Sequence, residues 1–153
     1  MSTRPNSAAA TPRLPGLTEP QWALLRWLPF AATAAFSLLM SAMAPEGRRP
    51  FHIDWSLSLA ALEFSVVKAP HIGATAVLAW LGVMGSGRLR WPRALMLTVL
   101  IGAGWELCQT TVIGHYARVS DLVPDTLGAL IGCLLGTVTL WTLEPLFSET
   151  DRR

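Results

Sequence analysis

The sequence predicts an all-α polytopic membrane protein with four transmembrane helices and a short interfacial helix between the first and the second. Hydrophobic residues make up 52% of the 153 residues and charged residues only 14%, whereas a water-soluble domain carries roughly 25% charge. Four stretches lack charged residues and approach or match the ~20 residues that cross a bilayer. These stretches lie between Arg26 and Glu46, His71 and Arg88, Arg93 and Glu106, and Asp125 and Glu144.

The first twenty residues differ from the rest of the chain in composition. Residues 1–20 contain four prolines and show no apolar periodicity, which predicts a disordered cytoplasmic tail. A cleaved signal peptide is the alternative, because an apolar run precedes the small residues Ala42 and Ala44. Pro45 directly after that site argues against cleavage and favours an uncleaved first span. The transmembrane domain is expected over 21–146, with a short cytoplasmic tail over 147–153.

Length and flanking residues place the four spans in order. The predicted spans are Trp22 to Ala44, Val67 to Gly85, Ala94 to Val112, and Leu122 to Leu143. Between the first two, the stretch Leu57 to Val67 reaches only about half the hydrocarbon core at ~1.5 Å per residue. We therefore expect an interfacial helix there instead of a fifth crossing.

The distribution of lysine and arginine predicts the orientation, because these residues are enriched on the cytoplasmic side. With the amino terminus inside, eight of them fall on the inner side and four on the outer side. The inner set is Arg4, Arg13, Arg26, Arg88, Arg90, Arg93, Arg152 and Arg153, and the outer set is Arg48, Arg49, Lys68 and Arg118. Both termini are therefore predicted to be cytoplasmic.

Polar and ionisable side chains occur in or just above the outer halves of three predicted spans. Such groups are costly in a bilayer, so they tend to face the bundle interior and to find partners. Spacings of three and four residues place them on single helix faces. The candidate site residues are Lys68, His71, Glu106, Gln109, Arg118, Asp121 and Asp125. The alternative is that these residues only join the helices through hydrogen bonds, each of which contributes about 0.6–2 kcal/mol to helix association.

Charge arithmetic favours one compensated cluster. Lys68 and Arg118 supply two positive charges, and the three carboxylates supply up to three negative charges. A protonated His71, or a carboxyl group kept neutral by burial, would balance them. We therefore expect the second, third and fourth spans to meet at these residues.

A line of glycines runs down the fourth predicted span. Gly128, Gly132 and Gly136 form two overlapping GxxxG motifs, which allow a second backbone to approach closely. We expect these glycines to bring the fourth span against the second or the third. Docking with another copy of the chain, or with another membrane protein, is the alternative use of this face.

Three short motifs resemble the pattern KxxH, ExxQ and RxxDxxxNxxG of the VanZ-like family. The matching residues are Lys68 and His71, Glu106 and Gln109, and Arg118, Asp121, Asp125 and Gly128. Their order on successive apolar spans carries the resemblance, which covers about Pro29 to Leu143. Asp125 stands where the pattern has asparagine, so a carboxylate replaces a neutral amide.

The resemblance implies a helical protein of the bacterial cytoplasmic membrane. The family's namesake is associated with low-level resistance to teicoplanin, a lipoglycopeptide antibiotic that acts at the outer face of the membrane. Membership alone does not assign resistance to this chain, because function depends on the site and not on the fold.

The predicted cluster leads to three functional hypotheses. It binds or acts on an amphiphilic envelope molecule, such as a lipid, a lipid-linked precursor or a lipoglycopeptide, with Lys68 and Arg118 engaging phosphate or carboxylate. Alternatively, His71 or Glu106 is the general base of an enzyme acting on a lipid phosphate or acyl group. Third, the chain is a non-catalytic scaffold or subunit.

Other partners are not expected. The arginines lie at span ends and form no basic stripe with aromatic residues, which argues against nucleic acid. Cys108 and Cys133 form no metal-ligand pattern and indicate ordinary packing. No cofactor is predicted, and no metal either, because Lys68 and Arg118 would compete with a cation and His71 is the one histidine within a span.

Overall fold

The computed structural model describes residue 16 and residues 18–150, and within them the chain is helical without an extended strand. The α-helices are α1 (Glu19–Ala42), α2 (Leu59–Val66), α3 (Ala69–Ser86), α4 (Trp91–Gln109) and α5 (Leu122–Thr150). Two 3-10 turns precede α4 and α5, namely η1 (Arg88–Arg90) and η2 (Val119–Asp121). The predicted all-α class is confirmed.

The helices differ from the predicted spans mainly at their ends. α1 begins at Glu19, and α5 continues to Thr150, beyond residue 147 where a tail was predicted. Within the two predicted tails, residues 1–15, 17 and 151–153 lie outside the described residues. α4 ends at Gln109 instead of Val112, because the backbone N–H of Thr110 turns back to the Leu107 carbonyl.

Two helical stretches are long and apolar enough to cross a membrane alone, namely Glu19–Ala42 and Val119–Leu143. Leu59–Val66 and Ala69–Ser86 together make a third if the pair, bent by 64°, is one broken span. By this measure the described chain has two to three candidate spans, not clearly the four predicted. The third predicted span corresponds to α4, which carries Arg93 and Glu106 within its 19 residues, and these charges lower its hydropathy.

Local sequence explains where the helices begin and bend. At the start of α1, the Gln21 side chain accepts a hydrogen bond of 3.0 Å from the Thr18 backbone N–H, as in a capping box. The Ser58 hydroxyl caps α2 by accepting from the Ala61 N–H. Pro70 lacks the N–H that would bond to the Val66 carbonyl, so α2 ends and α3 starts in a new direction. The predicted short helix between the first two long helices is therefore present.

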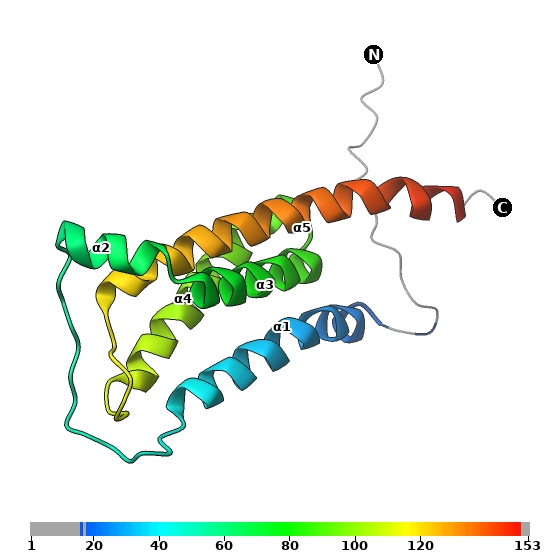
Figure 1. Cartoon of the computed structure of the whole chain (residues 1–153). Coiled ribbons are helices and arrows are strands. Elements are labelled where there is room, and N and C mark those ends of the chain that lie inside the picture. Colours follow the sequence, from blue (N-terminus) through cyan, green and yellow to red (C-terminus); the bar gives the residue numbers. More distant parts are fainter. Residues whose placement is uncertain (1–15, 17, 151–153) are drawn as a thin grey trace.

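α3 is the central helix of the bundle and lies alongside α5, with α4 packed against both and α1 packed against α3 and α4 (Figure 1). One core cluster consists of small residues, which let these helices approach closely: Ala79, Val83, Ala94, Ala129 and Cys133. A second cluster joins α1, α3 and α4 through Phe30, Ala34, Leu78 and Trp105. The start of α1 and the end of α5 lie at the same end of the bundle (Figure 1).

Two loops pair at the opposite end of the bundle. The segment between α1 and α2 bonds to the segment between α4 and α5, with Arg49 N–H donating to the Thr111 carbonyl at 2.8 Å. Asp54 N–H donates to Ala117, and Val119 N–H donates to Asp54. These backbone bonds join two segments about sixty residues apart in sequence and hold the loop residues beside the ends of α2 and α5.

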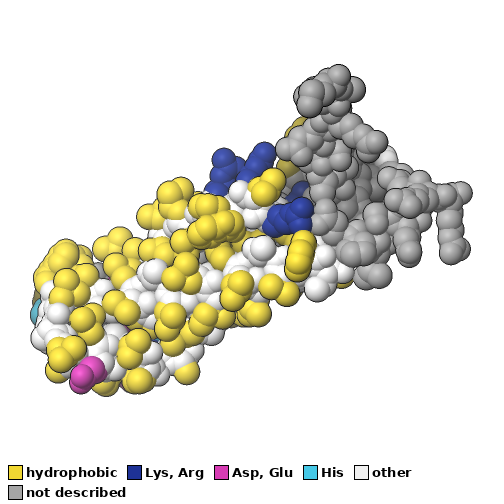
Figure 2. All heavy atoms as spheres, turned by 90° about the horizontal axis from the view of Figure 1, so that it is seen from above, with side chains coloured by type: hydrophobic (Ala, Val, Ile, Leu, Met, Phe, Trp, Pro, Cys, Tyr) yellow, Lys and Arg dark blue, Asp and Glu magenta, His cyan; other side chains and the backbone are white. Residues whose placement is uncertain are grey.

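The outer surface of the helices is apolar, as a lipid-facing surface should be. Figure 2 shows hydrophobic side chains over most of the visible face, with lysine and arginine gathered towards one end. Large side chains more than half exposed include Leu24, Phe36, Leu39, Met96, Leu100, Leu107, Leu134 and Trp141. Length, hydropathy and this surface together indicate a membrane protein.

Candidate functional site

Lys68 and Asp121 form a close ion pair where α2, α3 and η2 meet. The Lys68 Nζ lies 2.6 Å and 2.5 Å from the two carboxylate oxygens of Asp121, whose side chain is 2% exposed. The buried Ser65 hydroxyl lies 2.8 Å from Asp121 Oδ1 and 2.8 Å from the Ser120 hydroxyl. Lys68 is the residue before α3, so the bend between α2 and α3 aims its side chain at η2.

His71 and Asp125 form a second pair, one helical turn deeper. His71 Nδ1 lies 2.9 Å from Asp125 Oδ1, and the Asp125 side chain is fully buried. The Trp105 ring meets the imidazole edge to face, with ring centroids 6.2 Å apart. Gly102 on α4 leaves room for Asp125, because a Cβ at that position would overlap the carboxylate.

Glu106 brings α4 into the same cluster. Its Oε2 accepts a hydrogen bond of 2.6 Å from the Arg118 backbone N–H. Its other oxygen is buried and has no hydrogen-bond partner among the described residues. Because α4 ends at Gln109, Glu106 lies in the last turn of the helix and nearer its end than the predicted span placed it.

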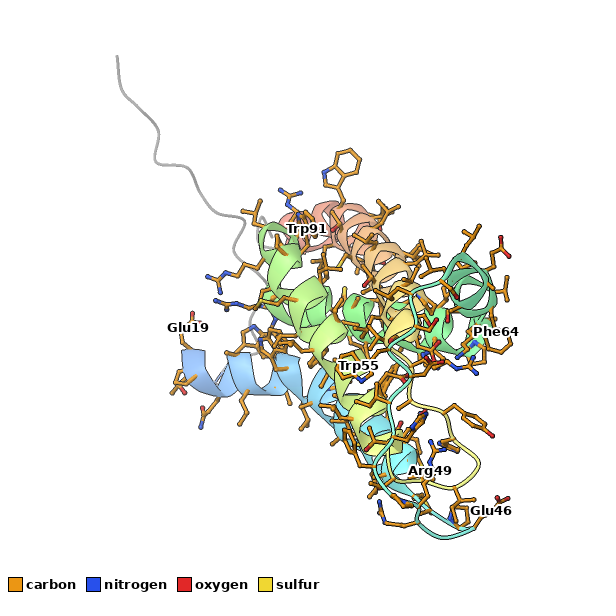
Figure 3. The ribbon with its side chains drawn as sticks, turned by 90° about the vertical axis from the view of Figure 1, so that its left-hand side faces the viewer. Glu19, Glu46, Arg49, Trp55, Phe64 and Trp91 are labelled. Atoms are coloured by element: carbon orange, nitrogen blue, oxygen red, sulfur yellow. The ribbon has the colours of Figure 1, made fainter. Side chains whose placement is uncertain are left out.

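The Arg118 side chain lies apart from these carboxylates. Its guanidinium carbon lies 4.9 Å from the centre of the Phe64 ring, and its Nε is 3.7 Å from Asp54 Oδ2. Lys68 Nζ also lies 5.3 Å from the Phe64 ring centre. Phe64 on α2 and Arg49 on the joining segment lie on the same side of the view in Figure 3, opposite Glu19 at the start of α1.

Tyr116 extends this group of cations and rings. Its ring centre lies 5.3 Å from the Arg49 guanidinium carbon and 5.9 Å from that of Arg118. We use "cation–aromatic cluster" for Arg49, Phe64, Lys68, Tyr116 and Arg118. Cations near ring faces are attracted by about 0.5–2 kcal/mol, and a partly exposed cation held this way stays accessible to an anion.

Six of the seven predicted residues thus take part in contacts with one another. Gln109 makes no hydrogen bond with any other predicted residue in the described part of the chain. Sequence reasoning missed Ser65, Phe64 and Trp105 as parts of the site. Ser65 offered a signal, since it lies three residues before Lys68 in an apolar stretch. Phe64 and Trp105 offered none, because aromatic residues are common throughout these helices.

The glycine line of α5 faces α3. A Cβ at Gly128 would overlap Thr75 and the Ile72 backbone, and one at Gly132 would overlap the Ala76 backbone. Gly136 lies against Val83 in the same way. This close contact sets Asp125 opposite His71. It also means that the GxxxG face of α5 is covered by α3 of the same chain.

The cluster combines several chemical capacities. Asp125 can hold the imidazole in one orientation, which leaves its second nitrogen for a proton, a ligand or a metal ion. His71, Glu106 and Asp121 offer one ligand atom each, all within 4.8 Å of one another. The cation–aromatic cluster beside them can attract an anionic group.

The fold and the site define the class: a helical membrane protein with a buried polar cluster at one end of the bundle. A model of the VanZ/LLP1 family matches residues 10–141, which is most of the chain. The chain belongs to this family, as its motifs predicted. No curated protein and no solved structure matched in the corresponding comparisons.

Proposed function

We propose that this protein binds an amphiphilic molecule of the bacterial cell envelope through an anionic headgroup, at the outer leaflet of the cytoplasmic membrane. The observation that carries the proposal is the convergence of Lys68 and Arg118 on the Phe64 ring. Both side chains are about a quarter exposed, so a headgroup can reach them from the membrane surface. The exposed apolar side chains of the helices would face the acyl chains.

The headgroup is expected to carry phosphate or carboxylate. Arginine presents two parallel N–H groups that match such oxygens, and lysine adds a mobile point charge. Asp54 and Asp121 hold these cations in the unliganded protein and would share them with the ligand. Lipids, lipid-linked precursors and lipoglycopeptides all meet this description. A role in resistance to teicoplanin-like antibiotics would follow if the last of these bind.

Binding to a short-chain phospholipid tests the proposal. We expect purified protein to bind dihexanoyl phosphatidylglycerol more tightly than dihexanoyl phosphatidylcholine, measured by native mass spectrometry. The double variant Lys68→Ala/Arg118→Ala should lose about tenfold or more, because each charge-assisted contact contributes roughly 1.5–3 kcal/mol. Undecaprenyl phosphate and teicoplanin, titrated in the same way, distinguish the ligand classes.

The matched control is Arg90→Ala/Arg93→Ala, which removes two cations at the opposite end of α4. Both side chains are exposed there, and we expect affinity for the phosphatidylglycerol within about twofold of the parent. Equal losses in the two double variants would mean that net charge, and not the cluster, attracts the lipid. Such a result would contradict the proposal.

We also propose that the chain crosses the membrane four times with both termini in the cytoplasm. At ~1.5 Å per residue the 18 residues of α3 and the 19 residues of α4 reach nearly 30 Å, close to the hydrocarbon thickness. Arg88, Arg90 and Arg93 at the α3–α4 turn favour a cytoplasmic position for that turn.

Cysteine labelling checks this topology. In a background of Cys108→Ser and Cys133→Ala, we expect a membrane-impermeant maleimide to label His115→Cys in intact cells but not Leu89→Cys. Both residues are exposed, His115 between α4 and α5 and Leu89 between α3 and α4. Leu89→Cys should react only after the membrane is opened. Labelling of both, or of Leu89→Cys alone, in intact cells would exclude the proposed arrangement.

A further inference from the structure

We propose that His71, Glu106 and Asp121 form a binding site for a divalent transition-metal ion of the Zn²⁺ type. This inference goes beyond lipid binding and does not rest on it. The three side chains come from α3, α4 and η2, and each offers one ligand atom within 4.8 Å of the other two. Ligands of tetrahedral zinc are about 3.3–3.5 Å apart, so closing the site requires movements of about 1 Å.

Glu106 supplies a second, independent reason to place a cation at this site. The residue is 7% exposed, and its Oε1 is buried with no hydrogen-bond partner among the described residues. Its Oε2 is fixed by the Arg118 backbone N–H at 2.6 Å. An unpartnered carboxylate oxygen is costly in an apolar environment, and a bound cation would remove that cost.

Asp125 prepares His71 to act as a ligand. The Asp125 carboxylate holds Nδ1 at 2.9 Å, which favours the tautomer with the proton on Nδ1 and leaves the Nε2 lone pair free. A carboxylate behind a ligating histidine is the usual outer-shell arrangement in zinc sites. Asparagine at this position would accept the same hydrogen bond but would increase the basicity of the ligand less.

The charges around the site also favour a divalent ion. Glu106, Asp121 and Asp125 carry three negative charges when ionised, and Lys68 is the one cationic side chain that contacts any of them in the described chain. With a neutral His71, two negative charges remain. The sequence argued against a metal because two cations would compete, but the Arg118 side chain instead lies against Asp54 and Phe64.

Lys68 acts in this site as an internal competitor of the metal. Its ammonium group occupies both Asp121 oxygens, and a metal ion must displace it from at least one. The side chain is 23% exposed and already lies near the Phe64 ring, where the displaced ammonium can remain. Removing the positive charge of Lys68 should therefore strengthen metal binding.

Zinc titration of the full chain, purified without a polyhistidine tag and monitored by competition with a chromophoric chelator, tests the site. We expect Glu106→Gln and His71→Asn to weaken Zn²⁺ binding by about tenfold or more. Lys68→Met should strengthen it while weakening phosphatidylglycerol binding. The matched controls Glu63→Gln and His115→Asn alter exposed residues and should leave the affinity unchanged.

A second measurement leaves the three proposed ligands unchanged, so it does not depend on whether the ligand variants fold. The His52→Asn/His115→Asn variant keeps His71 as its only histidine, since the chain has three. Bound Co²⁺ in this variant should show the visible absorption of a site with one imidazole ligand. Failure to bind either metal, or Zn²⁺ affinity that is the same in Glu106→Gln, Lys68→Met and the parent, would overturn the metal site. Neither result would contradict the lipid proposal. The two proposals are distinguishable because loss of the Lys68 charge should weaken phosphatidylglycerol binding but strengthen Zn²⁺ binding.

Discussion

Trp105→Ala is expected to lower the free energy of unfolding by about 3–5 kcal/mol, the usual range for a buried tryptophan. Trp105 is 5% exposed and packs with Phe30, Ala34 and Leu78, so it joins three helices. Its indole N–H also donates a 3.0 Å hydrogen bond to the Ser37 hydroxyl on α1. Truncation would leave a cavity, and the Ser37 hydroxyl would keep only the hydrogen bond that it donates to the Ala34 carbonyl. It would also remove the ring that packs against His71.

Chemical unfolding in mixed micelles, followed by circular dichroism, measures this loss. Trp105→Phe should cost about 1 kcal/mol through the lost hydrogen bond, with some further loss of packing. Trp141→Ala is the matched control, because that side chain is 69% exposed on α5. Similar losses for Trp105→Ala and Trp141→Ala would show that Trp105 does not join the helices as described.

Gly132→Ala is expected to destabilise the protein by about 1–3 kcal/mol, because α3 and α5 touch backbone to backbone at this position. The added methyl group would overlap the Ala76 backbone. A backbone cannot rotate away as a flexible side chain can, so α5 must move outward. That movement would also increase the distance between Asp125 and His71.

The same unfolding measurement serves here, with Gly73→Ala as the control. A Cβ at Gly73 meets no atom within 4 Å, and alanine favours a helix by about 1 kcal/mol over glycine. Gly73→Ala should therefore equal or exceed the parent in stability. If Gly132→Ala is as stable as Gly73→Ala, the close contact between α3 and α5 is wrong.

Much of the fold was predictable from the sequence because helix periodicity and helix breakers are local properties. The short length of the apolar stretch Leu57 to Val67 indicated a short helix followed by a long one, and α2 and α3 have that form. The end of α4 was misplaced by three residues. Val112 is apolar and was therefore included in the predicted span. In the structure its backbone instead forms an isolated β-bridge with Arg48 in the segment between α1 and α2.

The composition of the site was predictable, but the pairing within it was not. Helical spacing placed Lys68 and His71 on one face, and charge balance indicated that carboxylates would be near. The choice of Asp121 for Lys68 and Asp125 for His71 depends on the bend before α3 and on the closeness of α5, which are tertiary properties. Likewise, no local signal shows that Arg118 contributes its backbone N–H to Glu106 while its side chain packs on Phe64.

The long sequence separation of the two charge pairs has a consequence for synthesis of the chain. Lys68 and His71 precede Asp121 and Asp125 by 53 and 54 residues. At about 5–20 residues per second, the ribosome needs roughly 3–10 s to add the partners. During this interval the nascent chain holds a cation and an imidazole at the membrane without their carboxylates. A chain that stops before Asp121 never gains these carboxylates, so its Lys68 and His71 lack the partners that they have in the finished protein.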